Sequence, residues 1–327
     1  NIRPSRAIEV LPYFTSKGEY LRHVQGDPFN KGHEYEPEGG ADLRMSLGTK
    51  LTLNATINPD FGQVEVDPAV VNLSDVETYF PEKRPFFVEG SSIFDSGQQG
   101  ASDYWGFNFN NPTFFYSRRI GHAPDGSVPS DAQFSDVPGG TTILGAAKLS
   151  GKLSPSVNVG WLSAVTAREM ADNQRADLSR FKSEVEPVAY YGAARLMKEF
   201  PERRHGIGSL VTLAYRDLHT DALRGALNRD AVTGVIDGWH FFDRDQMWVL
   251  SGYLSGSLVQ GSAGRITELQ NGSRHYFQRP DAEHLGVDSS ATSLGGVAAR
   301  VWLNKEKGHV FSNSALGVIS PGYEVSD

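Results

Sequence analysis

The sequence predicts an all-β protein built from antiparallel strands, each with one apolar face and one polar face. Two observations lead to this prediction: polarity alternates along several segments, and turn-prone stretches separate these segments. Composition is a third, because Gly supplies 35 of the 327 residues, roughly 11% where ~7% is usual. Small residues in amphipathic strands suit the wall of an antiparallel β-barrel of the outer-membrane type.

The clearest alternation runs from Leu43 to Ile57, where odd positions carry no charge and even positions are polar or small. A period of two over 15 residues indicates one long strand. At ~3.3 Å per residue and a tilt near 45°, such a strand rises roughly 35 Å, enough to cross the ~25 Å apolar band of an outer membrane. We expect the odd side chains to face lipid, and Arg44, Lys50 and Asn54 to face inward.

Weaker alternation predicts further strands, about ten in all, joined as an antiparallel meander. These candidates are 142–153, 157–165, 188–200, 207–215, 236–242, 247–260, 293–303 and 310–319. Charged or turn-prone stretches separate them, among them 168–180, 201–205 and 304–308. A soluble β-sandwich or propeller alternates in the same way, so the pattern alone leaves both classes open. No blade-length repeat is evident, which disfavours the propeller.

One stretch, 58–95, breaks the alternation and is dense in charge, Pro and Phe. The four-residue spacing of Val71, Asp75 and Tyr79 indicates a short helix within 70–80. Pro81 and Pro85 are expected to stop any helix and to favour extended chain. Because loops of this length are uncommon unless they are functional or fold inward, we expect 58–95 to form a plug-like insert in the lumen.

Composition excludes several classes of function. The net charge of −8 disfavours a general nucleic-acid binder, and the lack of Cys removes disulfides, thiolate chemistry and Cys-ligated zinc. No apolar run approaches the ~18 residues of a membrane-spanning helix. No zinc-protease, esterase or nucleotide-binding motif is present, so no cofactor or metal is expected.

Charged residues in the insert form the candidate ligand-binding or plug network. Asp60, Glu65 and Asp67 could hydrolyse a glycoside or hold Ca²⁺. We favour the alternative that they pair with basic residues of the same region and fix a plug, since structural ion-pair networks imitate active sites. Those basic residues are Lys83, Arg84, Arg118 and Arg119.

Glu89 is the carboxylate with the most apolar local sequence, but Arg84 lies near enough in the chain to keep it ionised, so we expect no hydrolysis there. Tyr116 and the neighbouring phenylalanines offer surfaces on which sugar rings could stack, although aromatic side chains more often serve packing. These phenylalanines are Phe86, Phe87, Phe94, Phe114 and Phe115.

Four segments resemble a large bacterial family of unknown function. They are DFGQVEVDPAVVNLSDVETYFPEKRPFFVEGSSIFD at 60–95, FFYSRRIG at 114–121, RPDAEHLGVDSSATSLGG at 279–296 and SPGYEVSD at 320–327. Members of that family typically carry an amino-terminal domain like carbohydrate-binding module family 9, followed by an outer-membrane-type β-barrel. The resemblance implies that 1–327 is one partial barrel region, without the sugar-binding-type domain and the final strands.

The resemblance also implies a Gram-negative bacterial outer membrane as the location, with membrane lipid and a saccharide as the partners. We therefore expect a barrel that anchors a glycan-binding domain or passes a saccharide or another solute, without enzymatic activity. The alternative is a periplasmic or surface all-β glycoside hydrolase that uses the carboxylates of 60–67.

Overall fold

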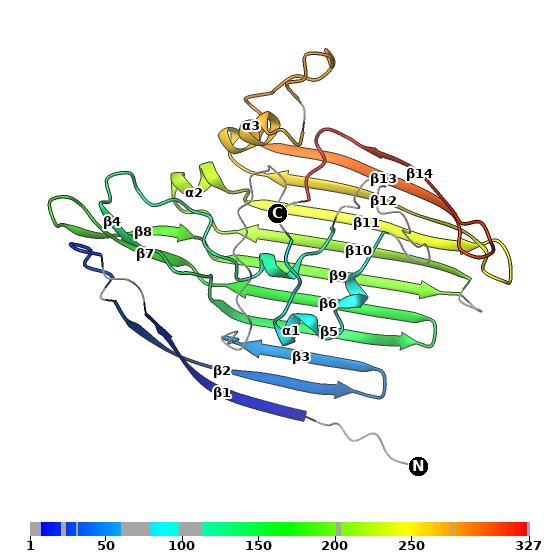
Figure 1. Ribbon diagram of the computed structural model, residues 1–327, viewed down its shortest axis with the longest axis horizontal. Coiled ribbons are helices and arrows are strands. Elements are labelled where there is room, and N and C mark those ends of the chain that lie inside the picture. Colours follow the sequence, from blue (N-terminus) through cyan, green and yellow to red (C-terminus); the bar gives the residue numbers. More distant parts are fainter. Residues whose placement is uncertain are drawn as a thin grey trace.

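Eleven strands pair in one antiparallel sheet in the computed structural model. The structure describes residues 8–20, 24–30, 32–59, 79–97, 113–200, 204–275 and 277–325. The sheet has the order β1-β2-β3-β5-β6-β9-β10-β11-β12-β13-β14, so strands follow one another almost as they do along the chain (Figure 1). The strands are β1 (Ile8–Glu19), β2 (Glu34–Leu47), β3 (Leu51–Ile57), β4 (Phe134–Asp136), β5 (Ile143–Ser154), β6 (Val157–Thr166), β7 (Glu169–Gln174), β8 (Arg180–Glu186), β9 (Ala189–Glu199), β10 (His205–Arg216), β11 (Asp230–Phe241), β12 (Trp248–Gln260), β13 (Ser293–Lys305) and β14 (Ser312–Ile319).

The predicted all-β class and the antiparallel meander are therefore confirmed. Within the described residues, β1 and β14 each pair with a single strand, so they are edge strands and the sheet is open. The strands β4, β7 and β8 form a separate sheet of three (Figure 1); β7 and β8 lie in the connection between β6 and β9, and β4 precedes β5.

The two faces of the large sheet differ in what covers them. One face, here called the covered face, carries side chains that are buried; they include Lys148, Arg195, Asp237, Tyr253 and Trp302. Alternate residues point to the open face, where apolar side chains are exposed. The burial pattern of β12 shows the alternation along almost its whole length.

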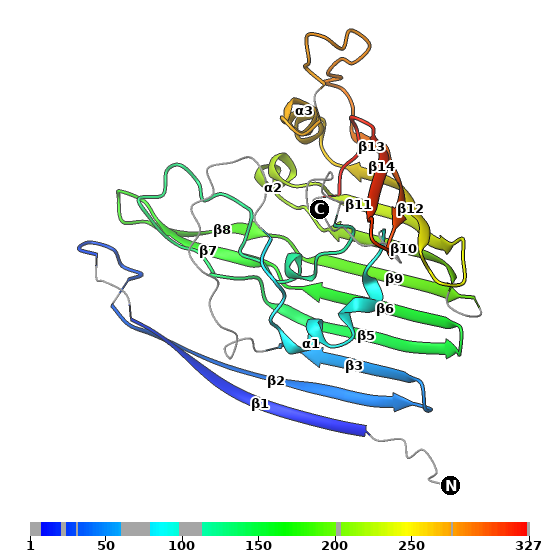
Figure 2. The same cartoon turned by 45° about the vertical axis from the view of Figure 1, so that its right-hand side comes forward.

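Short helices and extended chain lie across the covered face (Figure 2). They are α1 (Pro85–Val88), η1 (Ser91–Phe94) and η2 (Ser117–Arg119), while α2 (Asp221–Ala226) and α3 (Ala263–Asn271) lie in connections between strands. The core is formed where this layer meets the sheet; Phe87, Phe94 and Phe114 pack there with residues such as Leu162 and Trp302. In the described part of the chain, no helix is long and apolar enough to cross a bilayer.

The chain after β14 also returns to the covered face. The Tyr323 hydroxyl hydrogen-bonds the Ser255 hydroxyl at 2.6 Å, and the Glu324 amide donates to Ser257 Oγ at 2.9 Å. His275, which follows α3, contacts the same segment through Glu324 at 2.9 Å. A Cβ atom on Gly296 would lie 2.3 Å from the Tyr323 backbone nitrogen, so the segments 279–296 and 320–325, which carry part of the family resemblance, meet near the start of β13.

The single strand predicted over Leu43–Ile57 is wrong, because these residues form a hairpin. β2 ends at Leu47, a turn with Gly48 at φ 72° follows, and β3 begins at Leu51. Leu47 pairs with Leu51 and Arg44 with Asn54, so even positions share one face on both strands. The alternation continued through the turn, and for that reason it did not show the turn. Arg44 and Asn54 share one face of the sheet, as expected, and both contact Glu89 on the covered face, whereas Lys50 lies in the turn.

Other boundaries also differ from the prediction. The stretch 168–180, expected to be a turn, contains β7, and β8 begins at its end. Pro85 begins helix α1 where it was expected to stop a helix, because a proline at the first helical position loses no hydrogen bond. The helix expected within 70–80 falls almost wholly outside the described residues.

Candidate functional site

Three buried phenylalanines hold the 79–97 and 113–120 segments on the covered face. Phe87, Phe94 and Phe114 are 2%, 4% and 6% exposed. Phe114 meets Tyr253 of β12 edge-on at 5.1 Å, and Phe94 packs beside Phe115 at the same centroid distance. For the three buried rings, the packing role is the one that the structure supports.

Arg84 is the centre of the polar contacts in this layer. Its guanidinium forms a bidentate pair with Glu82, at 2.8 Å from Nε and 2.7 Å from Nη2. It also donates to the carbonyl oxygens of Ser117 at 2.8 Å and Ile120 at 2.5 Å, and it lies 4.2 Å from the centroid of the Phe87 ring. One side chain thus ties the chain before α1 to the helical turn η2.

Glu82 is held ionised by this arrangement. Burial would raise the pKa of its carboxyl group, but hydrogen bonds from Arg84 and Ser117 and the positive charge of Arg84 outweigh burial and lower the pKa. The Ser117 hydroxyl donates to Glu82 Oε2 at 2.6 Å. An ionised carboxylate with these partners accepts hydrogen bonds and cannot serve as a general acid at neutral pH.

Lys148 and Glu89 fix the other end of α1 to the sheet. Lys148 of β5 is fully buried, and its ammonium group donates to the carbonyl oxygens of Phe86 and Glu89. The Glu89 carboxylate pairs with Arg44 of β2 at 2.8 Å and accepts from Asn54 of β3 at 3.4 Å. Glu89 therefore pairs with Arg44 of β2, and not with Arg84 as the sequence suggested.

Tyr116 and Arg118 join the two segments again. The Tyr116 hydroxyl donates to the Phe80 carbonyl at 3.1 Å and accepts from the Phe80 amide at 3.0 Å. Arg118 donates to the Pro81 carbonyl at 3.2 Å and lies 5.7 Å from the Phe80 ring centroid. Tyr79 packs on Tyr116 at 4.8 Å.

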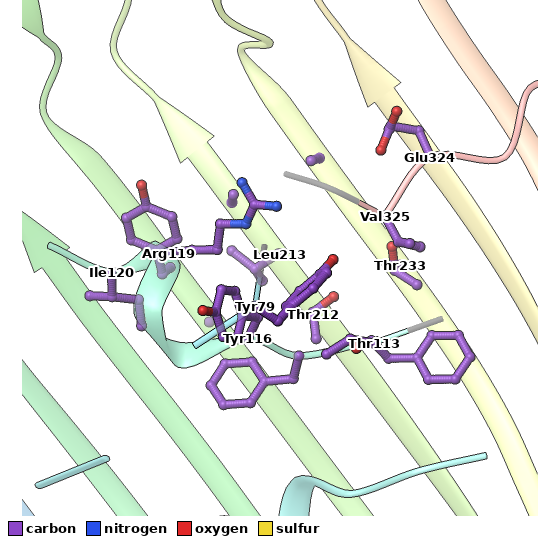
Figure 3. A pocket seen from close by; sticks show the side chains of 16 residues that line it. Tyr79, Thr113, Tyr116, Arg119, Ile120, Thr212, Leu213, Thr233, Glu324 and Val325 are labelled. Carbon is purple, nitrogen blue, oxygen red and sulfur yellow. The ribbon is translucent and has the colours of Figure 1, made fainter. Parts of the chain in front are cut away.

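Arg119 lies beside Tyr79 and Tyr116 at a small cavity of about 40 Å³ (Figure 3). Thr212 and Thr233 approach it from β10 and β11, and Glu324 and Val325 border it from the carboxyl-terminal segment. A volume of this size holds a water molecule or two and not a sugar ring. We therefore assign the stacked tyrosines to packing and not to a saccharide site.

The network clamps the layer to the sheet. In the described ranges, no three His, Asp or Glu side chains converge as a metal site would require. The structure brings Arg84, Arg118, Arg119 and Tyr116 together around η2, whereas Glu89 lies at the far end of α1. Asp60, Glu65 and Asp67 are outside the described residues, so the hydrolytic and Ca²⁺ alternatives built on them stay predictions.

Sequence reasoning missed Glu82 and Lys148. The signal for Glu82 was its spacing of two residues from Arg84, which lets a carboxylate fold back on a guanidinium. Lys148 had no local signal, because its partners are backbone carbonyls of a distant segment.

A family model described as Domain of unknown function (DUF5916) matches residues 4–282. Neither the curated proteins nor the solved structures contain a match to this chain.

Proposed function

The chain belongs to the family of domains of unknown function DUF5916, and we propose that its large sheet forms part of the wall of an outer-membrane β-barrel. In this proposal the open face contacts lipid, and the layer held by Arg84 and Lys148 fills part of the lumen as a plug. The barrel anchors a glycan-binding domain or passes a saccharide or another solute.

One observation carries the proposal: the open face of β9 to β14 is apolar, and its large side chains are exposed. Large apolar side chains on this face of β9 to β14 are between 36% and 82% exposed. They are Tyr190, Leu196, Ile207, Val211, Leu213, Tyr215, Val232, Ile236, Trp248, Leu250, Leu254, Leu258, Val297, Val301, Leu303, Leu316 and Val318. Soluble monomers rarely expose contiguous apolar patches beyond a few hundred Å², so a surface of this kind needs an apolar partner.

Charge is confined to the ends of these strands. From β9 to β13, the charged residues in register with the open face are Lys198, Asp230 and Lys305, each at or next to the end of its strand. β10 has 12 residues, so its eleven steps span ~36 Å and at a tilt near 45° rise ~26 Å, close to the ~25 Å apolar band of outer-membrane barrels. The pattern matches what a bilayer imposes.

Aromatic residues border the band at both ends, as interfacial girdles do. Tyr190 and Tyr215 are direct partners across β9 and β10 at one end. At the other end the Lys198 ammonium lies 5.0 Å from the Phe200 ring centroid, and Lys305 lies 5.9 Å from the Trp248 ring centroid. Lysines that reach past aromatic rings in this way favour a boundary between hydrocarbon and water.

The saccharide in this proposal comes from the family resemblance of the sequence, because members of that family carry a sugar-binding-type domain. The polar contacts of the covered face support a hydrated lumen. The location that follows is the outer membrane of a Gram-negative bacterium.

Fluorescence quenching by brominated lipids tests the membrane contact. Trp161 of β6 is 41% exposed on the open face, whereas Trp302 of β13 is 1% exposed on the covered face. Two variants that each retain one of these tryptophans, with the other tryptophans replaced by Phe, are reconstituted into vesicles. We expect strong quenching of Trp161 and little of Trp302. Equal and weak quenching of both, with the protein recovered in the aqueous fraction, would overturn the membrane wall and support a soluble β protein, the class that the glycoside-hydrolase alternative requires.

A further inference from the structure

A second and larger cavity, of about 390 Å³, lies between η1 and the covered face of the sheet. Its volume falls in the range of ~300–1,000 Å³ that is typical of small-molecule sites. Gly90, Ser92, Ile93 and Asp95 border it from η1 and its ends. The opposite wall comes from the covered face and from the ends of β5, β6, β9 and β11, through Ser150, Gly151, Lys152, Asn158, Met197, Glu199 and Trp239.

Trp239 presents a flat aromatic surface in this cavity. Its cross-strand partner is Gly206 of β10. A Cβ atom on Gly206 would lie no more than 2.6 Å from three consecutive carbons of the indole ring, at nearly equal distances. A neighbour that met the ring at its edge would be much closer to one carbon than to the others. The ring therefore lies with one face on the Gly206 backbone, and the opposite face is turned toward the covered side of the sheet.

Polar groups of both signs surround this surface. Asp95 and Glu199 supply carboxylates, Lys152 an ammonium group, and Asn158 an amide that donates to Glu199 Oε1 at 3.5 Å. A simple cation would meet Lys152, and a simple anion would meet two carboxylates. Hydroxyl groups suit the mixed set, because each can donate to a carboxylate and accept from an ammonium or an amide.

We propose that this cavity binds a neutral mono- or disaccharide, with Trp239 stacked against the apolar face of a pyranose ring and Glu199 and Asn158 bonded to its hydroxyls. Asp95 and Lys152 complete the ring of partners, and η1 forms the roof. The assignment rests on the proposed function for the presence of a solute in the lumen, and it names the class and the site of that solute.

Saturation-transfer NMR on the full chain in detergent micelles tests the site. The probes are glucose, galactose, N-acetylglucosamine, maltose and cellobiose, with arginine and inorganic phosphate as charged competitors. The variants are Trp239→Leu, Glu199→Gln and Gly206→Ala, and circular dichroism checks that each is folded. Gly234→Ala is the matched control for Gly206→Ala, because a Cβ on Gly234 meets nothing within 4 Å.

We expect at least one sugar to bind the parent and the Gly234→Ala variant equally. Binding should weaken by roughly tenfold or more in Trp239→Leu and Glu199→Gln. Gly206→Ala should weaken it also, since the added methyl group displaces the indole ring. The proposal is overturned if no sugar binds the folded parent, if arginine or phosphate binds in place of the sugars, or if Trp239→Leu binds as the parent does.

Micelles satisfy an apolar surface whether or not it faces lipid in the cell, so this result is independent of the quenching experiment. Quenching of Trp161 without sugar binding would leave the membrane wall in place and remove the saccharide site. Sugar binding without quenching of Trp161 would keep the saccharide site and remove the membrane wall.

Discussion

Arg195 and Asp237 form a fully buried ion pair that bridges two strands that are not neighbours. Arg195 lies on β9 and Asp237 on β11, and their side chains meet over β10 through two hydrogen bonds of 2.5 and 2.8 Å. The bridge passes over Gly208, the β10 residue paired with Asp237. The Gly97 amide donates to Asp237 Oδ2 at 2.9 Å, so the pair also holds the chain that leaves η1.

Gly208 is required for this bridge. A Cβ atom there would lie 2.8 Å from both Arg195 Nη2 and Asp237 Oδ1. We expect Gly208→Ala to lower the free energy of unfolding by about 1–3 kcal/mol, the usual cost of overpacking. Gly234→Ala on β11 should cost far less. Urea titrations in detergent measure both, and equal midpoints for the two variants would show that the bridge adapts without cost.

Arg84 should contribute much more to stability than Arg118. The Arg84 and Glu82 side chains are 11% and 13% exposed, and Arg84→Ala removes the positive partner of this carboxylate and a donor to two carbonyl oxygens. Loss of one partner of a buried pair costs about 3–5 kcal/mol. Arg118→Ala removes an exposed hydrogen bond to the Pro81 carbonyl and should cost about 1 kcal/mol or less. Thermal melts of the two variants measure the difference, and similar shifts would contradict the central role of Arg84.

The contact between His275 and Glu324 predicts a pH dependence of stability. Burial would lower the pKa of His275, but hydrogen bonds with Glu324 and the Pro321 carbonyl and the Glu324 charge raise it above its ordinary value. A raised pKa means that the folded state binds the proton more tightly than the unfolded state does. The stabilisation is therefore complete below a pH of ~6.5, the ordinary pKa of histidine, and is lost as pH rises through the folded pKa.

Melting temperatures measured from below this pH to well above it test the effect. The parent should lose stability over this window. Glu324→Gln should lose less, because the uncharged side chain no longer stabilises the protonated form of His275. His219→Gln, at a half-exposed histidine, is the control and should follow the parent. If Glu324→Gln and the parent have the same pH profile, the contact does not hold the carboxyl-terminal segment.

The alternation of side chains predicted the antiparallel sheet and the shared face of Arg44 and Asn54, because strand periodicity is a local property of the sequence. It did not reveal the turn between Leu47 and Leu51, since an odd number of turn residues kept the two strands in phase. It also missed β7, whose sequence EMADNQ is polar on both sides. The residues that β7 buries include the polar Asn173 and Gln174, so no apolar face marks this strand in the sequence.

The sequence predicted only those contacts of the site that are local in the chain. Arg84 stood out as a charge among phenylalanines, and its pairing with a carboxylate was expected. The contact of Glu89 with Arg44 and the burial of Lys148 beneath α1 depend on where a long segment crosses the sheet. The spacing of residues in one segment carries no information about that crossing.

A charge placed on the open face gives the last prediction. Leu254 lies mid-strand on β12 and is 58% exposed, and Leu178 lies in the β7–β8 turn and is 72% exposed. In water, both positions should tolerate arginine. In a bilayer, Leu254→Arg should cost about 2–4 kcal/mol, as arginine does near the midplane of a membrane barrel. Leu178→Arg should cost almost nothing. Folding yields and unfolding free energies in lipid vesicles compare the two, and a Leu254→Arg protein that folds as stably as Leu178→Arg would place the open face in water.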